Sequence, residues 1–258
     1  MTTAELLALY DRYERRGAAY PDYERNESAR TIRMTSLDGG HNFVIWSALN
    51  AATADDAISA EQDFYSSYKN GFEWKLYSHD QPANLKELLA AQGFSIGEDE
   101  AVMVLELDSL PEALRRAPTV EVRKALDEIT QADYAAVNKA TWPDDDGHWV
   151  AAVLKTIRNQ PERMSAYVAY IDGLPVCAAR IDFPEHSPFA SIWGGATLEA
   201  YRKQGAYTAV LAARAQEAVQ RGYKFLTIDA SPMSRPIAEK YGFRLLAVSN
   251  PCDWKPGQ

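Results

Sequence analysis

Repeating patterns of apolar and polar residues predict the elements of the first half of the chain. Apolar residues recur at helical spacing and predict helices over 4–16, 54–69 and 82–93. Alternation of apolar and polar residues predicts strands within 31–50, 72–79 and 100–107. The first of these strand segments is expected to be a hairpin that turns at Asp38, Gly39 and Gly40.

The second half restarts after residues 107–119, which contain two prolines and no strand pattern and therefore predict a linker. Helices are predicted over 128–141, 147–158, 205–221 and 234–243. Strands are predicted within 120–125, 165–183, 189–199, 224–230 and 245–249. The segment 165–183 is expected to be a hairpin with its turn at Asp172 and Gly173.

Residues 72–94 and 225–243 repeat one order of features: a strand, a turn marked by proline, a short helix and Gly-Phe. Any such unit can end in Gly-Phe, because glycine supplies a left-handed helix end and phenylalanine anchors the next strand. The two segments also occupy matching places within their halves, which favours a duplication.

Composition and charge narrow the classes of function. The 258 residues suffice for two domains, and 27 basic against 36 acidic side chains give a net charge of −9, which disfavours nucleic acid and anionic membranes as partners. Cys177 and Cys252 form no close pair, and the four histidines lie far apart, so we expect no disulfide and no metal site. No run resembles a signal peptide or a membrane span, which predicts a cytoplasmic protein.

The stretch AYRKQGAYTAV, residues 200–210, places a basic pair and one glycine directly before a predicted helix. A helix N-terminus offers unpaired amides and a partial positive charge, so the amides from Gln204 to Thr208 could hold a phosphate. The preceding strand contains Gly194 and Gly195, and glycines inside a strand usually mark a bulge or a close approach of a ligand. A bulge that only relieves the twist of the sheet is the alternative. A bulge, a basic loop and a helix start that follow one another directly suggest a long ligand with a phosphate tail.

This succession resembles the GNAT superfamily of acyl-CoA-dependent N-acetyltransferases. The family signature, (Gln/Arg)-x-x-Gly-x-(Gly/Ala), maps onto Arg202, Lys203, Gln204, Gly205, Ala206 and Tyr207. Five positions comply, and Tyr207 stands where a second small residue is typical. The resemblance implies that the loop amides, through Thr208, hold the pyrophosphate of acetyl-CoA. It also implies that the backbone of Ala196, Thr197 and Leu198 pairs with the pantetheine arm.

The resemblance extends over roughly residues 119–250, and Ser231 falls where the family often has an asparagine that contacts pantetheine. The implied fold class is α+β, with two GNAT-like domains, each a mixed, mostly antiparallel twisted sheet flanked by helices, and with a bulged central strand in the second. We expect a degenerate domain over 1–110, because no glycine loop precedes the helix of 54–69, and a catalytic domain that binds acetyl-CoA over 119–258.

Candidates for acid and base are less well marked. Many family members carry a tyrosine four residues before the glycine of Gly-Phe, but Ala238 occupies that place and Tyr241 is displaced by three residues. Ser234 is a candidate proton donor, although a hydroxyl at a helix start is more often a cap. Asp182, at the end of a strand, is the candidate base that we single out, and a plain hairpin-end acid is the alternative. Further candidates are Asp229 and the run Asp144, Asp145 and Asp146.

Three interpretations follow. The first is an N-acetyltransferase that moves an acetyl group from acetyl-CoA to an amine of a small molecule or peptide, with Trp142, Trp149 and Trp193 as possible walls of the acceptor pocket or as core residues. The second is an acyl-CoA-binding sensor or interaction module without turnover. The third, a nucleotide-binding α/β domain, conflicts with the predicted hairpins. The acceptor and the oligomeric state stay open.

Overall fold

The computed structural model describes residues 1–145 and 147–257, and their contacts divide the chain into two units. Each unit is assembled from segments that are separate in sequence. Unit 1 consists of Met1–Met103, Asp229–Pro236 and the segment from Leu245 onward. Unit 2 consists of Val104–Ile228 and Ile237–Arg244. The chain therefore passes between the units more than once.

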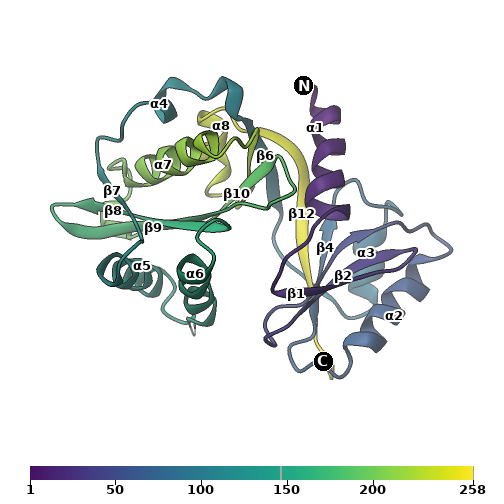
Figure 1. The fold of residues 1–258 in the computed structure, drawn as a ribbon. Coiled ribbons are helices and arrows are strands. Elements are labelled where there is room, and N and C mark those ends of the chain that lie inside the picture. The colour runs from purple at the N-terminus through teal and green to yellow at the C-terminus, as the bar shows by residue number, and fades with distance from the viewer. Residues whose placement is uncertain (146, 258) are drawn as a thin grey trace. The chain divides into compact units, whose positions relative to one another are not determined.

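Unit 1 contains a mixed sheet with helices on both faces (Figure 1). Its elements are α1 (Thr3–Tyr10), a π-helical turn (Asp11–Arg16), β1 (Tyr23–Glu27), β2 (Thr31–Ser36), β3 (Phe43–Ser47), α2 (Ala54–Tyr65), β4 (Phe72–Tyr77), α3 (Leu85–Ala91) and β5 (Ser95–Ile96). The strand β12 (Arg244–Trp254) completes the order β1-β2-β3-β4-β12, and β5 also pairs with β12. β3 and β4 are parallel to each other, and the pairs β1–β2, β2–β3, β4–β12 and β5–β12 are antiparallel.

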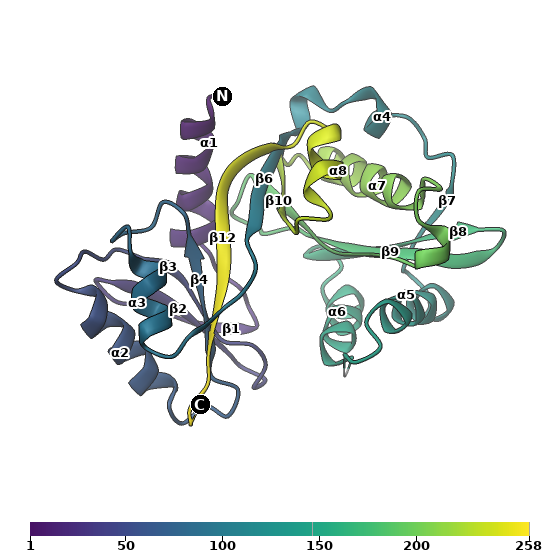
Figure 2. The same cartoon turned by 180° about the vertical axis from the view of Figure 1, so that it is seen from behind.

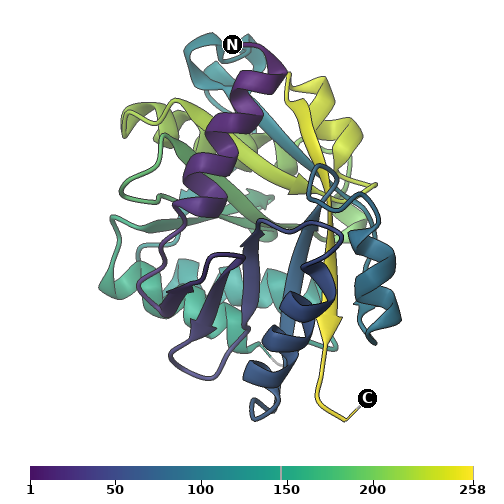
Figure 3. The same ribbon diagram turned by 90° about the vertical axis from the view of Figure 1, so that its right-hand side faces the viewer.

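The core of unit 1 lies mainly between the sheet and the helices α2 and α3. Figure 3 shows the ribbon of this unit in a view turned by 90°. Trp74 of β4 is 1% exposed and packs with Ile58 and Tyr65 of α2 and Leu89 of α3. A smaller cluster, which includes Ile32 and Met34 of β2, covers the other face. This division follows from the alternation of side chains along each strand.

Unit 2 contains the sheet β7-β8-β9-β10-β11. Its helices and strands are η2 (Leu107–Ser109), α4 (Glu112–Arg115), β7 (Glu121–Lys124), α5 (Glu128–Thr141), α6 (His148–Asn159), β8 (Met164–Ile171), β9 (Leu174–Asp182), β10 (Phe189–Thr197), η3 (Glu199–Tyr201), α7 (Ala206–Gln220), β11 (Phe225–Ala230) and α8 (Arg235–Lys240). The strand β6 (Glu100–Glu106), like β11, α8 and β12, has residues in both units. Neighbouring strands from β7 to β10 are antiparallel, and β10 and β11 are parallel.

Helices cover both faces of the unit 2 sheet (Figure 2). On one face, Tyr134 and Val137 of α5 and Val153 of α6 pack against β8 and β9. On the other face, Ala206 and Val210 of α7 pack against β9. The predicted α+β class, with mixed and mostly antiparallel sheets flanked by helices, is confirmed.

Three strands depart from the expected pattern, and the shortest of them, β5, lies outside every predicted strand. The strand β1, in the polar stretch after the first helix, was not predicted, because it is half-exposed and its sequence YERNE shows no apolar alternation. The strand β12 continues past the predicted end at residue 249, because Asn250–Trp254 pair with β4 despite Pro251 within the strand. Within the described ranges, no helix combines the length and the apolar character needed to cross a membrane.

Candidate functional site

The strand β10 carries a bulge at its two central glycines. Trp193 pairs with Arg180 and Ala196 pairs with Ala178, so three residue steps on β10 face two on β9. Gly194 has a φ of +61°, which a residue with a side chain rarely adopts. The predicted bulge is therefore confirmed.

The edge of β10 that faces β11 is paired only over its first part. Among the described residues, the parallel register runs from Phe189 to Ser191, where Ser191 pairs with Thr227. Past this point β10 continues through the bulge to Thr197, and Leu198 donates its amide to the β9 residue Val176 at 2.9 Å. Residues 196–198 thus follow the bulge, beyond the end of the register between β10 and β11. Pairing of this backbone with pantetheine, which the family resemblance implies, stays a prediction.

The loop between β10 and α7 exposes its basic pair. Arg202, Lys203, Gln204 and Gly205 are all exposed, and the backbone turns at Lys203 with φ +63° and at Gly205 with φ +90°. The Arg202 side chain donates to Thr197 O at 3.4 Å. The Gln204 amide donates to Ala200 O at 3.1 Å. The first bond ties the loop to the end of β10, the second ties it to the preceding turn η3, and both basic residues stay exposed.

The helix α7 begins without a side-chain cap. Its N-cap is Gly205, which has no side chain to accept from the first-turn amides, and the first turn carries no acidic residue. By contrast, α5 begins with Asp127, whose carboxylate accepts from the Thr130 amide at 2.8 Å. The amides of Ala206, Tyr207 and Thr208 and the helix dipole are therefore available to an anion.

Tyr207, the residue that departs from the family signature, lies against the bulge. A Cβ placed on Gly195 would lie 2.8 Å from Cε2 of Tyr207. Burial raises the pKa of the Tyr207 hydroxyl, and nearby Arg214 opposes that rise. Arg214 is 1% exposed and donates to Arg180 O at 3.1 Å. The Tyr207 ring thus fills the space beside the glycine and connects the first turn of α7 to the bulged strand.

Tyr241 reaches the start of α7, although we discounted it from the sequence. Its hydroxyl and Thr208 Oγ1 form a hydrogen bond of 2.7 Å. Ala238, in the usual place of the family tyrosine, is 3% exposed and carries no hydroxyl. The sequence shows only that Tyr241 is three residues after Ala238. It does not show that Tyr241 contacts Thr208, because this contact depends on how α8 and α7 pack.

Ser231 and Ser234 lie in the unit 1 segment Asp229–Pro236 and bond to each other. Their hydroxyl oxygens are 3.2 Å apart, and the Ser234 amide donates to Ser231 Oγ at 3.3 Å. Both hydroxyls therefore have a local structural role at the turn before α8. Contact of Ser231 with the coenzyme, and proton donation by Ser234, stay predictions.

Asp229 forms an ion pair with Lys75 within unit 1. Burial lowers the pKa of the Lys75 ammonium, but Asp229, Tyr77 and Glu73 together outweigh this effect and hold that pKa well above its usual range. The Asp229 carboxylate is therefore already engaged by a cation of its own unit.

Asp182, the last residue of β9, lies in surroundings that make its carboxyl a weaker acid than an ordinary aspartate. Burial raises the pKa of its carboxyl, and the Arg180 guanidinium, whose Nε donates at 3.3 Å, opposes the rise. Arg180 also lies over the rings of Trp149 and Trp193, at 5.9 and 5.8 Å from their centroids. Asp182 and Arg180 are two residues apart on the strand and therefore share the sheet face that bears α5 and α6.

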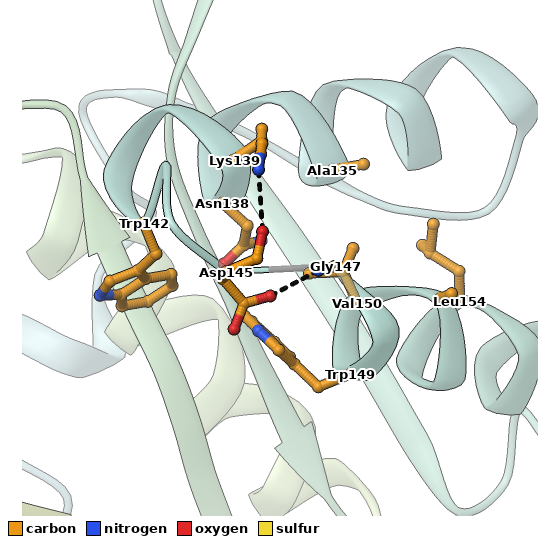
Figure 4. A pocket seen from close by; sticks show the side chains of 10 residues that line it. Ala135, Asn138, Lys139, Trp142, Asp145, Gly147, Trp149, Val150 and Leu154 are labelled. Carbon is orange, nitrogen blue, oxygen red and sulfur yellow. Dashed lines mark hydrogen bonds between the residues drawn. The ribbon is translucent and has the colours of Figure 1, made fainter.

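A separate pocket lies between α5 and α6 (Figure 4). It has a volume of about 250 Å³, and its lining includes Trp142, Trp149 and Asp145. The Asp145 carboxylate accepts from the Gly147 amide at 2.7 Å, while Asp144 is exposed. Asp146, the third acid of this run, lies outside the described residues. No cluster of His, Cys, Asp and Glu side chains within the described ranges could hold a metal ion.

Comparisons with known proteins agree with this geometry. The model of the acetyltransferase (GNAT) family matches residues 123–243. No curated protein sequence matches the chain.

Solved structures match nearly the whole chain. A GCN5-related N-acetyltransferase from Kribbella flavida is 15% identical, with 99% of this chain and 96% of that chain covered and a TM-score of 0.71. One from Sphaerobacter thermophilus is 13% identical, with 100% and 95% covered and a TM-score of 0.62. A tandem GNAT protein from the clavulanic acid biosynthesis pathway is also 13% identical, with 100% and 95% covered and a TM-score of 0.60. Residues 123–243 therefore form a GNAT acetyltransferase domain, within a chain that has the fold of tandem GNAT proteins.

Proposed function

We propose that this protein is an N-acetyltransferase that moves an acetyl group from acetyl-CoA to an amine of a small molecule or peptide. The observation that carries the proposal is the succession of the bulge at Gly194, the exposed basic loop and the uncapped N-terminus of α7. Each part matches one part of an extended ligand: a carbonyl at the bulge, an arm along residues 196–198 and a pyrophosphate at residues 202–208. The GNAT family supplies this chemistry in general, through transfer of an acyl group from acyl-CoA to an amine.

The two halves of the chain have different roles in this proposal. We assign coenzyme binding to a domain over 119–258 and none to a domain over 1–110. In the first half, α2 starts with Asp55 and Asp56 in its first turn, and the Ala54 amide donates to Asn50 O at 3.1 Å. Two carboxylates at that helix start would repel a pyrophosphate.

The reaction needs a neutral amine, a stabilised oxyanion and a proton for the departing thiolate. The amine nitrogen attacks the thioester carbon, a backbone amide at Gly195 or Ala196 donates to the developing oxyanion, and the C–S bond then breaks. Asp182 accepts the proton that the amine loses. Ser234 is the predicted donor to the thiolate, and the Tyr241 hydroxyl, which is hydrogen-bonded to Thr208 in the first turn of α7, is a second candidate.

Calorimetric titration with acetyl-CoA, desulfo-CoA and ATP tests the coenzyme site. We expect both CoA species to bind, because the pyrophosphate and the pantetheine arm are common to them, and ATP to bind at least about tenfold more weakly, because it lacks the arm. Failure of both CoA species to bind would contradict the proposal. Binding without release of free thiol across a panel of amines would favour the alternative, an acyl-CoA sensor, for which Ala238 in place of tyrosine is the supporting observation.

Asp182→Asn tests the base. Because burial raises the pKa of Asp182, its carboxyl ionises at a higher pH than an ordinary aspartate. Only the ionised carboxylate can accept a proton, so kcat/KM should rise with pH as Asp182 ionises. The variant should lose this rise and about tenfold in kcat/KM, while acetyl-CoA affinity stays within twofold of the parent. An unchanged pH profile would remove Asp182 from the mechanism.

A further inference from the structure

Arg180 lies directly beside the bulge of β10. It pairs with Trp193, the last residue of β10 in register with β9 before the bulge. Opposite residues of an antiparallel pair place their side chains on the same face, and Arg180 Cζ lies 5.8 Å from the centroid of the Trp193 ring. Trp149, whose centroid is 5.9 Å from the same atom, has its Cη2 3.6 Å from the point that a Cβ on Gly194 would occupy. The cation therefore lies between two indoles, next to the strand where the proposed function puts the acetyl carbonyl.

Arg180 and the bulge are both accessible from solvent. The Arg180 side chain is 21% exposed, and Trp193 is 37% exposed. Within the bulge Gly195 is exposed, whereas Ala196, the next residue, is buried. An acceptor therefore needs no passage through a buried layer to contact the cation or the bulged backbone.

The guanidinium of Arg180 is only partly engaged within the protein. Its Nε donates to Asp182 Oδ1 at 3.3 Å, and its two Nη atoms donate no hydrogen bond to any described residue. A guanidinium is a planar fork of N–H donors, and two of these donors match the two oxygens of a carboxylate. The Nη edge of Arg180 is therefore suited to a carboxylate of the acceptor.

The charges near Asp182 also favour an anionic group on the acceptor. Burial raises the pKa of the Asp182 carboxyl, whereas Arg180 and Arg163 both lower it. Two guanidiniums thus act on one carboxylate, and the three groups together carry a net positive charge when Asp182 is ionised. A carboxylate on the acceptor would be attracted to them, while a second ammonium would be repelled by both guanidiniums.

We propose that the acceptor is an α-amino acid, whose carboxylate binds Arg180 and whose amine is acetylated. One carbon joins the two groups, so a carboxylate on the Nη edge of Arg180 places the amine near Asp182 and the bulge. The nitrogen attacks the thioester carbon, the N–C bond forms and the C–S bond breaks. Of the two protons that the ammonium loses, one passes through Asp182 to solvent and one leaves on the thiol. This inference rests on the proposed acetyl transfer.

The test compares amino acids with their primary amides, using the full-length protein and saturating acetyl-CoA. One mixture holds leucine, phenylalanine, methionine, glutamine and threonine, and the other holds the corresponding α-carboxamides at the same low concentrations. Thiol release gives the rate with each mixture. We expect the acids to react at least about tenfold faster, the effect of hydrogen bonds to a charged group. The amine of an amide is less basic and more often neutral, so its intrinsic reactivity works against this result.

Arg180→Gln should reduce the ratio of the acid rate to the amide rate to about one, and a ratio within one variant does not depend on the amount of folded protein. Arg180→Lys should keep part of the preference, because it keeps the charge and loses the fork. Arg123→Gln is the matched control, since Arg123 also lies on a strand, donates to Glu121 at 2.7 Å and lies 4.2 Å from the centroid of the Tyr170 ring. This control should keep the parent ratio, because β8 and β9 separate β7 from β10.

The outcomes separate the two proposals. Thiol release that is equal for acids and amides, or faster for amides, would overturn this inference and leave acetyl transfer in place. A preference for acids that persists in Arg180→Gln would overturn the role of Arg180. Binding of CoA without thiol release from either mixture would also overturn this inference, and the wider panel of amines would then decide on acetyl transfer. Absence of CoA binding would overturn the proposed function, and this inference with it.

Discussion

Gly205→Asp is expected to abolish coenzyme binding while the protein stays folded. A side chain at this position has room, because its Cβ would lie 3.6 Å from Val120 Cγ2, an ordinary contact. The φ of +90° costs an aspartate roughly 1–2 kcal/mol. An N-cap aspartate recovers part of this by accepting from the first-turn amides of α7. The carboxylate would then occupy the amides assigned to the pyrophosphate and repel it, and the Kd for acetyl-CoA should rise at least about 100-fold.

Gly222→Asp is the matched control at the other end of the same helix. Gly222 has a φ of +85° with no atom near its Cβ position, so the variant carries comparable backbone strain and the same added charge. Its acetyl-CoA affinity should stay within about twofold of the parent, because surface charges this far from a ligand are screened. Calorimetry measures both affinities and urea unfolding measures both stabilities. Undiminished binding by Gly205→Asp would remove the loop from the coenzyme site.

Gly195→Val is expected to lower acetyl-CoA affinity by about 30-fold and to destabilise the protein. A Cβ there would lie 2.8 Å from the Tyr207 ring, so either the ring or the bulged strand must move, and overpacking of this kind costs about 1–3 kcal/mol. Tyr207 belongs to the first turn of α7, so a displaced ring disturbs the amides proposed to bind the pyrophosphate. Calorimetry and urea unfolding give the two effects.

The double variant Gly195→Val with Tyr207→Ala identifies the cause. Removal of the ring takes away the clash, so adding Gly195→Val to Tyr207→Ala should change acetyl-CoA affinity by less than about threefold. The coupling between the two sites would then be about 1–2 kcal/mol, as expected for residues in contact. A loss that is the same with and without the Tyr207 ring would mean that the valine acts on the bulge itself.

Local features of the site could be predicted from the sequence because a few adjacent residues determine them. Gly194 marks the bulge, Gly205 marks the uncapped start of α7, and Asp172 with Gly173 marks a hairpin turn, with φ +50° and +77°. Each depends on a backbone conformation that glycine or aspartate tolerates better than other residues do. The order of strands and helices in unit 2 could also be predicted, because apolar periodicity is likewise a property of adjacent residues.

Contacts between distant residues could not be predicted in this way. The bond of Tyr241 to Thr208 spans 33 residues, and the contact of Trp149 with Gly194 depends on how α6 packs on the sheet. Periodicity shows which face of an element is apolar, but it does not show which partner covers that face.

Unit 1 is built from segments that are far apart in the sequence, and this affects when it can fold during synthesis. Residues 1–103 leave the ribosome first, yet one edge of β4 is covered only by the β12 residues Ser249–Trp254. At about 5–20 residues per second, this edge waits roughly 10–30 s for its partner strand. An uncovered strand edge is a site of mispairing during that interval. Unit 1 therefore begins to emerge before unit 2 but reaches its full sheet only after β12 has emerged.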